Sequence, residues 1–461
     1  MVDDLRVHAG RERGPIRGDF VLYWMQGVAM RSSANFALNF AVEQANQLGL
    51  PVLVYQGLRQ AYPWASDRLH TFILESAVDL YHGFTKRGIQ YAFYLETPAP
   101  RPARSPLVDL ARRAALVVTD FFPTFIQPRQ LRALRAKVET PVVAIDSTTV
   151  VPLRYHTREY STARAIRPVL HEALPHYLFP IENPAPRVRR QVEVPFDQLL
   201  GGETGRAHIA RLVSGLDIDH SVTPAPTIRG GERAARDRLA TFIRSALPIY
   251  STQRSDPNVE ATSRLSPYLH FGNLSIHEVL LTAQAAGPSA EFAKFLDEAL
   301  VWRELAHNLC FMTTKHRTLA AVPAWARQEL DDHGGDPRTA IYHQAELEHA
   351  RTHDDLWNAC QRSLVHEGEL HNYLRMLWGK SVLLWTENAN RALKILEHLN
   401  NKYALDGRDP NSYGGILWCF GRFDRPFYRR PILGTVRYMS TKAAAAKFDA
   451  AAVIKRAGSL G

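Results

Sequence analysis

Residues 20–58 read FVLYWMQGVAMRSSANFALNFAVEQANQLGLPVLVYQGL. The two ends of this stretch, residues 20–26 and 51–58, are almost continuously apolar and rich in β-branched and aromatic residues, as is typical of buried parallel strands. Residues 33–48 between them have helical periodicity and enough length to cross back over a sheet. The pattern therefore predicts a strand, a helix and a second, parallel strand.

The same alternation continues to about Pro152. Further strands are expected at residues 89–96, 115–122 and 141–147, and further helices at residues 68–87, 105–113 and 128–137. Strands and helices that alternate in this way form an α/β domain with a doubly wound, Rossmann-like parallel sheet, which binds ligands near the carboxyl ends of its strands. No GxGxxG motif follows the first strand, so the sequence does not support a standard dinucleotide site there.

The second half of the chain has a different texture. Residues 179–230 are rich in Pro, Arg and Gly and predict an inter-domain linker. Helices are expected after it at residues 231–245, 275–285, 288–312, 354–368, 370–385 and 389–399. We therefore divide the chain into an α/β domain (residues 1–178), a linker (residues 179–230) and an all-helical domain (residues 231–461).

Composition narrows the class of protein. The chain has 461 residues, 46% of them hydrophobic, which indicates an ordered globular protein of two or three domains. A net charge of +10 favours an anionic partner. The three scattered cysteines, Cys310, Cys360 and Cys419, form neither a zinc motif nor a disulfide framework, so we expect core thiols, no metal and a reducing compartment. The sequence has neither a secretory signal pattern nor an 18-residue apolar run, and we expect a cytoplasmic protein with no membrane partner.

The segment TSRLSPYLHFGNLS, residues 262–275, combines small hydroxyl residues with Arg264 directly before an expected helix. Side chains and backbone N–H groups of this kind bind phosphate or pyrophosphate. A capped joint between two helices explains the same residues.

The segment FLDEALVWRELAHNLCFM, residues 295–312, places Glu298 and Trp302 four residues apart, and thus on one face of the expected helix. A carboxyl group beside an indole suits a site that binds a polar, planar ligand and excludes water. The alternative is a half-exposed glutamate beside a core tryptophan.

Tryptophans recur in the following helices. Trp378 and Trp385 are seven residues apart, which is two helical turns or about 10 Å along one face. Trp357 could extend the row from a neighbouring helix and pass an electron hole to the surface. Aromatic residues at helical spacing are more often simply part of a core.

The segment at residues 398–427 gathers Asn400, Asn401, Asp406, Arg408 and Asp409 within an otherwise apolar domain. Burial of these groups requires polar partners, which a polar cofactor would provide.

Residues 422–442 follow directly and hold six basic residues against one acidic residue, interleaved with Phe and Tyr. Such a segment suits contacts to a DNA backbone and stacking on bases, and a solvated basic face is the alternative.

Six segments in register closely resemble those of class II cyclobutane pyrimidine dimer (CPD) photolyases, in the photolyase/cryptochrome superfamily. They are SRLSPYLHFG, ELAHNLCF, HDDLWNA, HNYLRMLWGK, LNNKYALDGRDPNSYGGILWCFG and DRPF, spread over residues 263–427. The resemblance implies an enzyme, a deoxyribodipyrimidine photo-lyase, that holds FAD in its helical domain. Light would drive electron transfer from reduced FAD to a pyrimidine dimer flipped out of double-stranded DNA.

The resemblance also implies residue roles. The flavin contacts would be Tyr250, Thr262, Ser263, Arg264, Leu265, Ser266, Trp302, Arg375, Asn400, Asp406 and Arg408, with Asn400 beside the reactive ring nitrogen of the flavin. The DNA and lesion contacts would be Arg254, Ser255, Glu298, Trp302, Trp418, Arg425, Phe427 and Arg437. Trp378, Trp357 and Trp385 resemble the photoreduction path of the class. Glu298 would donate a hydrogen bond to the dimer, and Phe427 would fill the gap in the duplex.

Three positions depart from the family pattern. Leu377 precedes Trp378 where an aromatic residue is familiar, Phe427 stands in DRPF in place of DRPW, and Ser255 follows Arg254 where Asn is common. None of these changes removes the expected flavin site.

The remaining expectations concern chromophores, assembly and rival functions. The α/β domain could hold a second, antenna chromophore of deazaflavin, folate or flavin type, and the sequence does not identify which. We expect the protein to be a monomer associated with the nucleoid. One rival is a blue-light photoreceptor of the same superfamily. Glu298, Trp302, Trp418, the basic tail and the lack of a long disordered C-terminal extension favour repair over that rival. The other rival is a flavin electron-transfer or nucleotide-binding protein built around the α/β half. That function would leave the basic tail unexplained.

Overall fold

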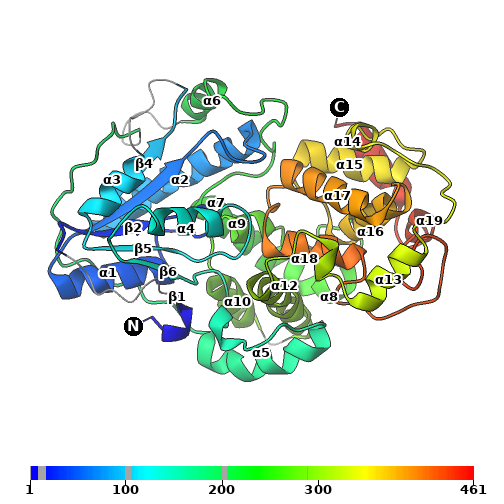
Figure 1. The fold of residues 1–461 in the computed structure, drawn as a ribbon, viewed down its shortest axis with the longest axis horizontal. Coiled ribbons are helices and arrows are strands. Elements are labelled where there is room, and N and C mark those ends of the chain that lie inside the picture. The colour runs from blue at the N-terminus through cyan, green and yellow to red at the C-terminus, as the bar shows by residue number, and fades with distance from the viewer. Residues whose placement is uncertain (1, 9–16, 99–104, 200–204, 288, 461) are drawn as a thin grey trace.

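The computed structural model describes residues 2–8, 17–98, 105–199, 205–287 and 289–460 (Figure 1). Its sheet contains all five predicted parallel strands: β2 (Val21–Trp24), β3 (Val52–Leu58), β4 (Gln90–Leu95), β5 (Leu116–Asp120) and β6 (Val142–Ile145). The sheet order is β1-β6-β5-β2-β3-β4. The sequence did not indicate β1 (Val7–His8), a two-residue strand that pairs antiparallel with β6 after the short helix η1 (Asp4–Arg6).

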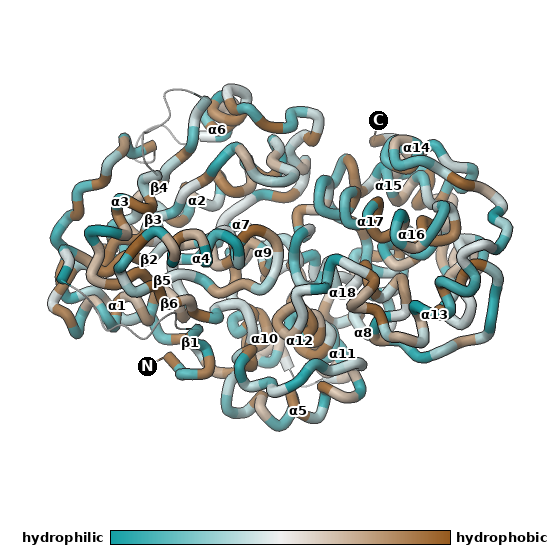
Figure 2. Tube along the Cα trace, in the orientation of Figure 1, coloured by the Kyte–Doolittle hydropathy of each residue, from teal (hydrophilic) through white to brown (hydrophobic). Residues whose placement is uncertain are grey.

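Four helices cover the sheet close to their predicted positions. They are α1 (Phe36–Leu48), α2 (Asp67–Arg87), α3 (Pro106–Arg113) and α4 (Gln127–Arg135). Side chains of α1 and α2 pack on one face of the sheet, with Val21 and Tyr23, while α3 and α4 pack on the other, with Phe20, Leu22 and Trp24. Figure 2 shows hydrophobic segments concentrated along these central strands.

Local chemistry sets the helix ends. The Asn35 side chain accepts a hydrogen bond from the Leu38 amide and Ser66 caps α2 in the same way, so α1 and α2 both begin after capping residues. Both helices end at glycines with left-handed backbone, Gly49 (φ 66°) and Gly88 (φ 65°), a conformation that costs glycine little.

The predicted linker packs along the α/β half. Val192 exchanges hydrogen bonds of 2.7 and 2.8 Å with Gln90, and the Phe196 ring lies 5.2 Å from that of Tyr94. The linker also contains α6 (Arg206–Ser214), which buries Ile209 and Val213. Helix α6 was not predicted, because the linker was inferred from the Pro, Arg and Gly content of this stretch and not from its periodicity.

A long helix before the linker contacts the helical half. It is α5 (Ala163–Tyr177), preceded by the short helix η2 (Leu153–Tyr155), and it includes Pro168 and Pro175. Arg167 of α5 pairs with Asp297 at 2.9 Å. The last segment of residues 1–178 therefore lies beneath α10 and α12 and away from the sheet (Figure 1).

The helical half has helical structure at each of the six predicted helix positions, two of which are interrupted, together with shorter helices. The elements up to residue 312 are α7 (Glu232–Thr241), η3 (Phe242–Ala246), η4 (Leu247–Ile249), α8 (Tyr250–Gln253), α9 (Ser266–His270), α10 (Ile276–Ala285), α11 (Ala290–Leu296), η5 (Asp297–Trp302) and α12 (Arg303–Met312). The elements after it are η6 (Leu319–Ala321), α13 (Ala324–Asp332), α14 (Gln344–Glu348), α15 (Asp355–Glu367), α16 (Asn372–Leu384), α17 (Ala389–Tyr403), α18 (Pro410–Cys419), α19 (Thr441–Ala445) and α20 (Ala450–Gly458). The three cysteines are buried and unpaired. No helix among the described residues has the length and apolarity to cross a membrane.

Two predicted helices are interrupted by π-helical turns. The helix expected over residues 288–312 consists of α11, the π-helical η5 and α12, and its first residue lies outside the described residues. The helix expected over residues 231–245 likewise passes from α7 into the π-helical η3. The prediction of continuous α-helices is therefore wrong at both places. Turns of π-helix often mark functional sites, and η5 contains both Glu298 and Trp302, which the sequence assigned to the site.

Arg68 joins the two halves of the protein. It lies on α2, is 1% exposed, and donates hydrogen bonds to the carbonyls of Tyr403 and Val365 at 2.6 Å each. It also donates to the carbonyl of Thr223 at 2.9 Å, at the end of the linker. One buried cation thus satisfies the last carbonyls of α15 and α17, and it fixes these helices to the α/β half.

Candidate active site

A cavity of about 500 Å³ lies inside the helical half, among α9, η5, α12, α16, α17 and α18. The predicted site residues that line it are Tyr250, Arg254, Thr262, Ser263, Arg264, Leu265, Ser266, Glu298, Trp302, Arg375, Trp378, Asn400, Asp406 and Trp418. The predicted site residues outside its lining are Ser255, Trp357, Trp385, Arg408, Arg425, Phe427 and Arg437.

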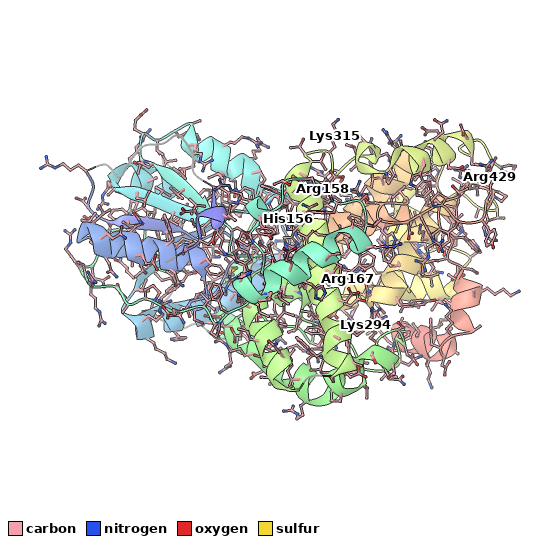
Figure 3. All side chains as sticks on the ribbon, turned by 90° about the horizontal axis from the view of Figure 1, so that it is seen from below. His156, Arg158, Arg167, Lys294, Lys315 and Arg429 are labelled. Atoms are coloured by element: carbon pink, nitrogen blue, oxygen red, sulfur yellow. The ribbon has the colours of Figure 1, made fainter. Side chains whose placement is uncertain are left out.

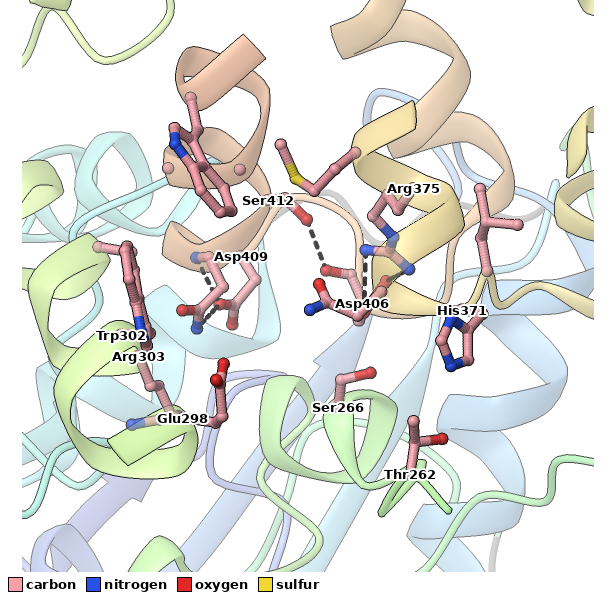
Figure 4. Close-up of a pocket in the computed structure, with 18 of the residues that line it drawn as sticks. Thr262, Ser266, Glu298, Trp302, Arg303, His371, Arg375, Asp406, Asp409 and Ser412 are labelled. Carbon is pink, nitrogen blue, oxygen red and sulfur yellow. Dashed lines mark hydrogen bonds and ion pairs between the residues drawn. The ribbon is translucent and has the colours of Figure 1, made fainter. Parts of the chain in front are cut away.

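Ion pairs and hydrogen bonds organise one side of the cavity (Figure 4). Arg375 on α16 binds both oxygens of Asp406, at 3.0 and 3.1 Å, and the Ser412 hydroxyl donates to the Asp406 carbonyl at 2.8 Å. Because a two-point guanidinium–carboxylate contact is directional, it holds α16 and the turn before α18 in a fixed relation.

Asp409 anchors the start of α18. Its carboxylate caps the helix through the Asn411 amide at 2.9 Å and contacts His270 at 3.1 Å. Burial alone would raise the pKa of Asp409, but the hydrogen bond to His270 and the nearby His307 and Arg303 bring this pKa below its usual value. A charged carboxylate is therefore retained at the bottom of the cavity.

The segment at residues 262–266 forms the wall opposite α16. Arg264 has a left-handed backbone (φ 52°), and its guanidinium contacts Glu369 at 3.1 Å. The carbonyls of Thr262 and Ser263 accept hydrogen bonds from Arg238 at 3.2 and 2.8 Å. Figure 4 shows Thr262 and Ser266 below the Arg375–Asp406 pair. The expected phosphate-binding segment therefore faces a pre-organised ion pair.

Two residues that the sequence analysis did not assign to the site place buried, unpaired polar groups in the cavity lining. Among the described residues, Arg303 Nη1 and both ring nitrogens of His371 are buried without a hydrogen-bond partner. Buried polar groups are normally hydrogen-bonded, so these groups fit a polar ligand in the cavity. Little in the sequence indicated that Arg303 and His371 belong to the site, since each stands next to or within an apolar helix of the predicted bundle.

The other side of the cavity carries an acid beside two indoles. Glu298 Oε1 lies 2.8 Å from Arg254 Nη2 and 2.8 Å from Lys294 Nζ. Trp302 stacks on Trp418 with ring centroids 5.4 Å apart and an interplanar angle of 27°. Lys294 lies on α11, near Arg167 of α5 (Figure 3), and the sequence analysis did not identify it. Glu298 with its two cations therefore lies next to an aromatic wall, which consists of Trp302 and Trp418.

The tryptophan row runs from the cavity into the protein. Trp378 lines the cavity and stacks on Trp357 with centroids 6.4 Å apart and planes within 9°. Trp357 is fully buried and contacts Trp385 edge-on at 5.8 Å. Trp385 in turn lies 5.9 Å from the ring of Tyr342 and 5.0 Å from that of the exposed His353. Trp357 thus stands between Trp378 on α16 and Trp385 directly after that helix, and the row reaches the surface at His353.

Asn400 lies in the last turns of α17 and lines the cavity. Its side chain is 2% exposed, and its amide nitrogen is 3.4 Å from Asn401 Oδ1. Asn400 therefore contributes a buried amide group to the cavity lining.

Arg408, which the resemblance implied as a flavin contact, lies in the turn that follows α17. Its guanidinium donates to the carbonyls of Asn401, Ala404 and Leu405 and lies outside the cavity lining. The Arg408 carbonyl accepts a hydrogen bond from Thr124 of the α/β half at 2.9 Å. The arginine therefore satisfies the C-terminal carbonyls of α17, and it shapes the turn without reaching the ligand space.

The basic tail begins at the aromatic wall. The Arg437 guanidinium lies 5.9 Å from the centre of the Trp418 ring and 5.5 Å from that of the Phe427 ring. The Arg425 guanidinium also lies over the Phe427 ring, at 5.7 Å. Ser255 is exposed beside Arg254 and does not line the cavity. Side chains that stand 127 to 139 residues after Glu298 in the sequence thus continue the wall formed by Trp302 and Trp418.

Comparison with known proteins shows the family to which the chain belongs. No protein-family model matches the chain. The deoxyribodipyrimidine photo-lyase of Methanothermobacter thermautotrophicus is 34% identical over 449 residues, which cover 96% of each chain. The Oryza sativa enzyme of the same name is 35% identical over 96% of this chain and 88% of its own. The chain belongs to the deoxyribodipyrimidine photo-lyase family.

Solved structures of the photolyase/cryptochrome superfamily have the same fold. A class III photolyase from Agrobacterium tumefaciens matches with a TM-score of 0.68 and 20% identity, covering 97% of this chain and 88% of its own. A cryptochrome from Synechocystis matches with the same TM-score and 14% identity, covering 95% of this chain and 88% of its own. The predicted fold class, an α/β domain followed by a helical domain, is confirmed.

Replacement of Asp406 by Ala tests the position of the cofactor that the resemblance implies. The change removes the partner of Arg375 and leaves a half-buried guanidinium unpaired, so we expect FAD affinity to fall by about 10-fold or more. The measurement is the flavin absorbance per protein after purification and a titration of flavin-free protein with FAD. Asp331→Ala, an exposed carboxylate on α13, is the control and should retain wild-type flavin content. Wild-type affinity in the Asp406→Ala variant would show that this ion pair lies away from the cofactor.

Proposed function

We propose that this protein repairs cyclobutane pyrimidine dimers in DNA when illuminated, as a class II photolyase. The observation that carries the proposal is one cavity with two chemically different walls. The wall around Arg375, Asp406 and residues 262–266 suits a nucleotide cofactor, and the wall of Glu298, Trp302 and Trp418 suits planar bases. The curated relatives named deoxyribodipyrimidine photo-lyase, which match along almost the whole chain, support it.

The residues of the cavity fit FAD. Arg303, His371 and Asn400 offer buried polar groups to a ligand, and the hydroxyls of residues 262–266 can donate to a pyrophosphate. Asn400 would lie beside the flavin ring. When bound, reduced and excited by blue or near-UV light, FAD supplies the single electron that opens the cyclobutane ring and then takes it back, so no reductant is consumed.

The aromatic wall would receive the lesion. Trp302 and Trp418 provide apolar faces for the dimer, which leaves the duplex at low cost because its bases pair and stack poorly. Glu298 would face a pyrimidine carbonyl. Both cations contact Oε1 of Glu298, so a protonated Oε2 would be the oxygen that donates a hydrogen bond to that carbonyl. Arg254 and Lys294 can then bind phosphates of the DNA.

The basic surface would hold the duplex. The net charge of +10 provides affinity that does not depend on sequence, and Arg425 and Arg437 lie next to the aromatic wall. We propose that one copy of the chain is sufficient for binding and repair. Any second, light-harvesting chromophore would lie in the α/β half, and a photolyase from Sulfolobus tokodaii was solved with two FAD molecules.

A photoreceptor of the same superfamily is the second candidate function. The Synechocystis cryptochrome supports it to the extent that it has the same fold. Retention of Glu298, Trp302 and Trp418 around one cavity favours repair.

The deciding experiment illuminates the purified flavoprotein with an oligonucleotide that contains one thymine dimer. We expect intact thymines to form in the light and not in the dark, as measured by chromatography of the products and by recovery of absorbance at 260 nm. A matched oligonucleotide with a 6–4 photoproduct tests the lesion class. Light-dependent flavin reduction without repair of either lesion would refute the proposal and favour a photoreceptor.

The tryptophan row predicts a separate effect on photoreduction. Trp378→Phe keeps an aromatic side chain at the cavity but places one that is far harder to oxidise next to Trp357. We expect photoreduction of oxidised FAD by an external donor to slow at least 10-fold, while repair by chemically pre-reduced protein stays within about 2-fold of wild type. The control is Trp325→Phe on α13, outside the row. Equal losses in the two assays would mean that Trp378 has only a packing role.

A further inference from the structure

The basic tail folds into a hairpin at residues 427–435. The Phe427 amide donates to the Thr435 carbonyl at 2.8 Å, and the Arg430 amide donates to the Gly434 carbonyl at 2.9 Å. Ile432 and Gly434 have left-handed backbone, with φ of 71° and 54°, which closes the turn. Residues 425–438 contain four arginines and no acidic residue. The hairpin is therefore a defined, positively charged projection.

Carboxylates near the end of α13 hold this hairpin in place. Glu329 accepts hydrogen bonds from the Thr435 amide at 3.0 Å and from the Arg429 guanidinium at 2.9 Å. Asp336 accepts one from the Ile432 amide at 2.8 Å and also contacts His333 at 2.7 Å. Because these hydrogen bonds hold the backbone of the hairpin, they fix the positions from which its side chains project. Figure 3 shows Arg429 at the outer edge of the helical half.

Phe427 and Tyr428 face different environments on the hairpin. Phe427, the residue that the sequence favoured as the wedge, is half-buried between Arg425 and Arg437. Tyr428 is 92% exposed, more than any other large hydrophobic side chain in the described ranges, which include residues 289–460. A fully exposed aromatic ring among arginines, on a rigid hairpin, matches the combination with which proteins stack on unpaired bases.

We propose that Tyr428 stacks on the bases of the complementary strand that lose their partners when the dimer leaves the duplex. The inference rests on the proposed repair function. Phe427 continues the aromatic wall through Arg437 and Trp418, and Tyr428 follows it directly along the hairpin with its ring 92% exposed. Extrusion of two bases leaves two opposite bases without pairing, and the arginines of the hairpin attract the backbone that carries them.

The test compares double-stranded and single-stranded DNA that contain the same thymine dimer. Only the duplex has a complementary strand, so Tyr428→Ala should weaken binding of the damaged duplex by about 10-fold and leave binding of the damaged single strand within 2-fold. Tyr428→Phe keeps the ring and should bind both as wild type. 2-Aminopurine placed opposite the dimer should be quenched less by Tyr428→Ala than by wild-type protein. Glu329→Gln weakens the anchor and should show a smaller loss that is also confined to the duplex.

Three results would overturn the inference. Equal losses on both DNAs would place Tyr428 on the lesion strand, and wild-type binding of both by Tyr428→Ala would make it a solvated side chain. Unchanged 2-aminopurine fluorescence would exclude contact with the opposite base. Flavin content and the thermal unfolding midpoint should match wild type in each variant, which separates a DNA-contact defect from misfolding. If the wild-type protein repairs no dimer in light, the repair function fails, whereas normal repair with an inert Tyr428 refutes this inference alone.

Discussion

The turn between α17 and α18, residues 404–409, carries the charged interactions on which the rest of the site depends. A helical bundle that buries Asp406, Arg408 and Asp409 must give each a partner, because an unpaired buried charge costs several kcal/mol, on the order of 3–5 when a partner is removed. Arg408 satisfies the carbonyls at the end of α17, Asp409 caps α18, and Asp406 fixes α16 through Arg375. These contacts position the helix that bears Trp418.

A continuous series of contacts leads from this helix to the surface. Trp302 stacks on Trp418, Arg437 covers Trp418 and Phe427, and Arg425 covers the outer part of Phe427. Such alternation of rings and guanidinium groups is favourable on its own, at roughly 0.5–1 kcal/mol per exposed contact. It also means that a base-sized ligand at the cavity mouth and a duplex on the basic tail would contact one connected structure. Affinity for damage and affinity for DNA are thus expected to be coupled.

The sequence predicted the parallel strands and most long helices because these elements are set by local periodicity and by caps such as Asn35 and Ser66. Fourteen of the 21 site residues predicted from the sequence line the cavity, although for these the resemblance contributed more than the physical pattern. Interactions between distant residues were beyond its reach. Nothing local predicts the π-turn at Glu298 or the orientation of Arg408 toward backbone carbonyls. Lys294, by contrast, stands four residues before Glu298, and this helical spacing could have indicated their ion pair. The opposite environments of Phe427 and Tyr428 likewise depend on the anchored hairpin.

In the proposed repair function, a flavin and a flipped dimer occupy the two walls of one cavity. This arrangement is tested most directly by the excited-state lifetime of the reduced, protein-bound flavin, recorded by time-resolved fluorescence with saturating DNA. We expect that a dimer-containing duplex shortens the lifetime several-fold, that undamaged duplex of the same sequence leaves it unchanged, and that the shortening disappears as light converts the dimer. An identical lifetime with damaged and undamaged duplex, under conditions where both are bound, would contradict it.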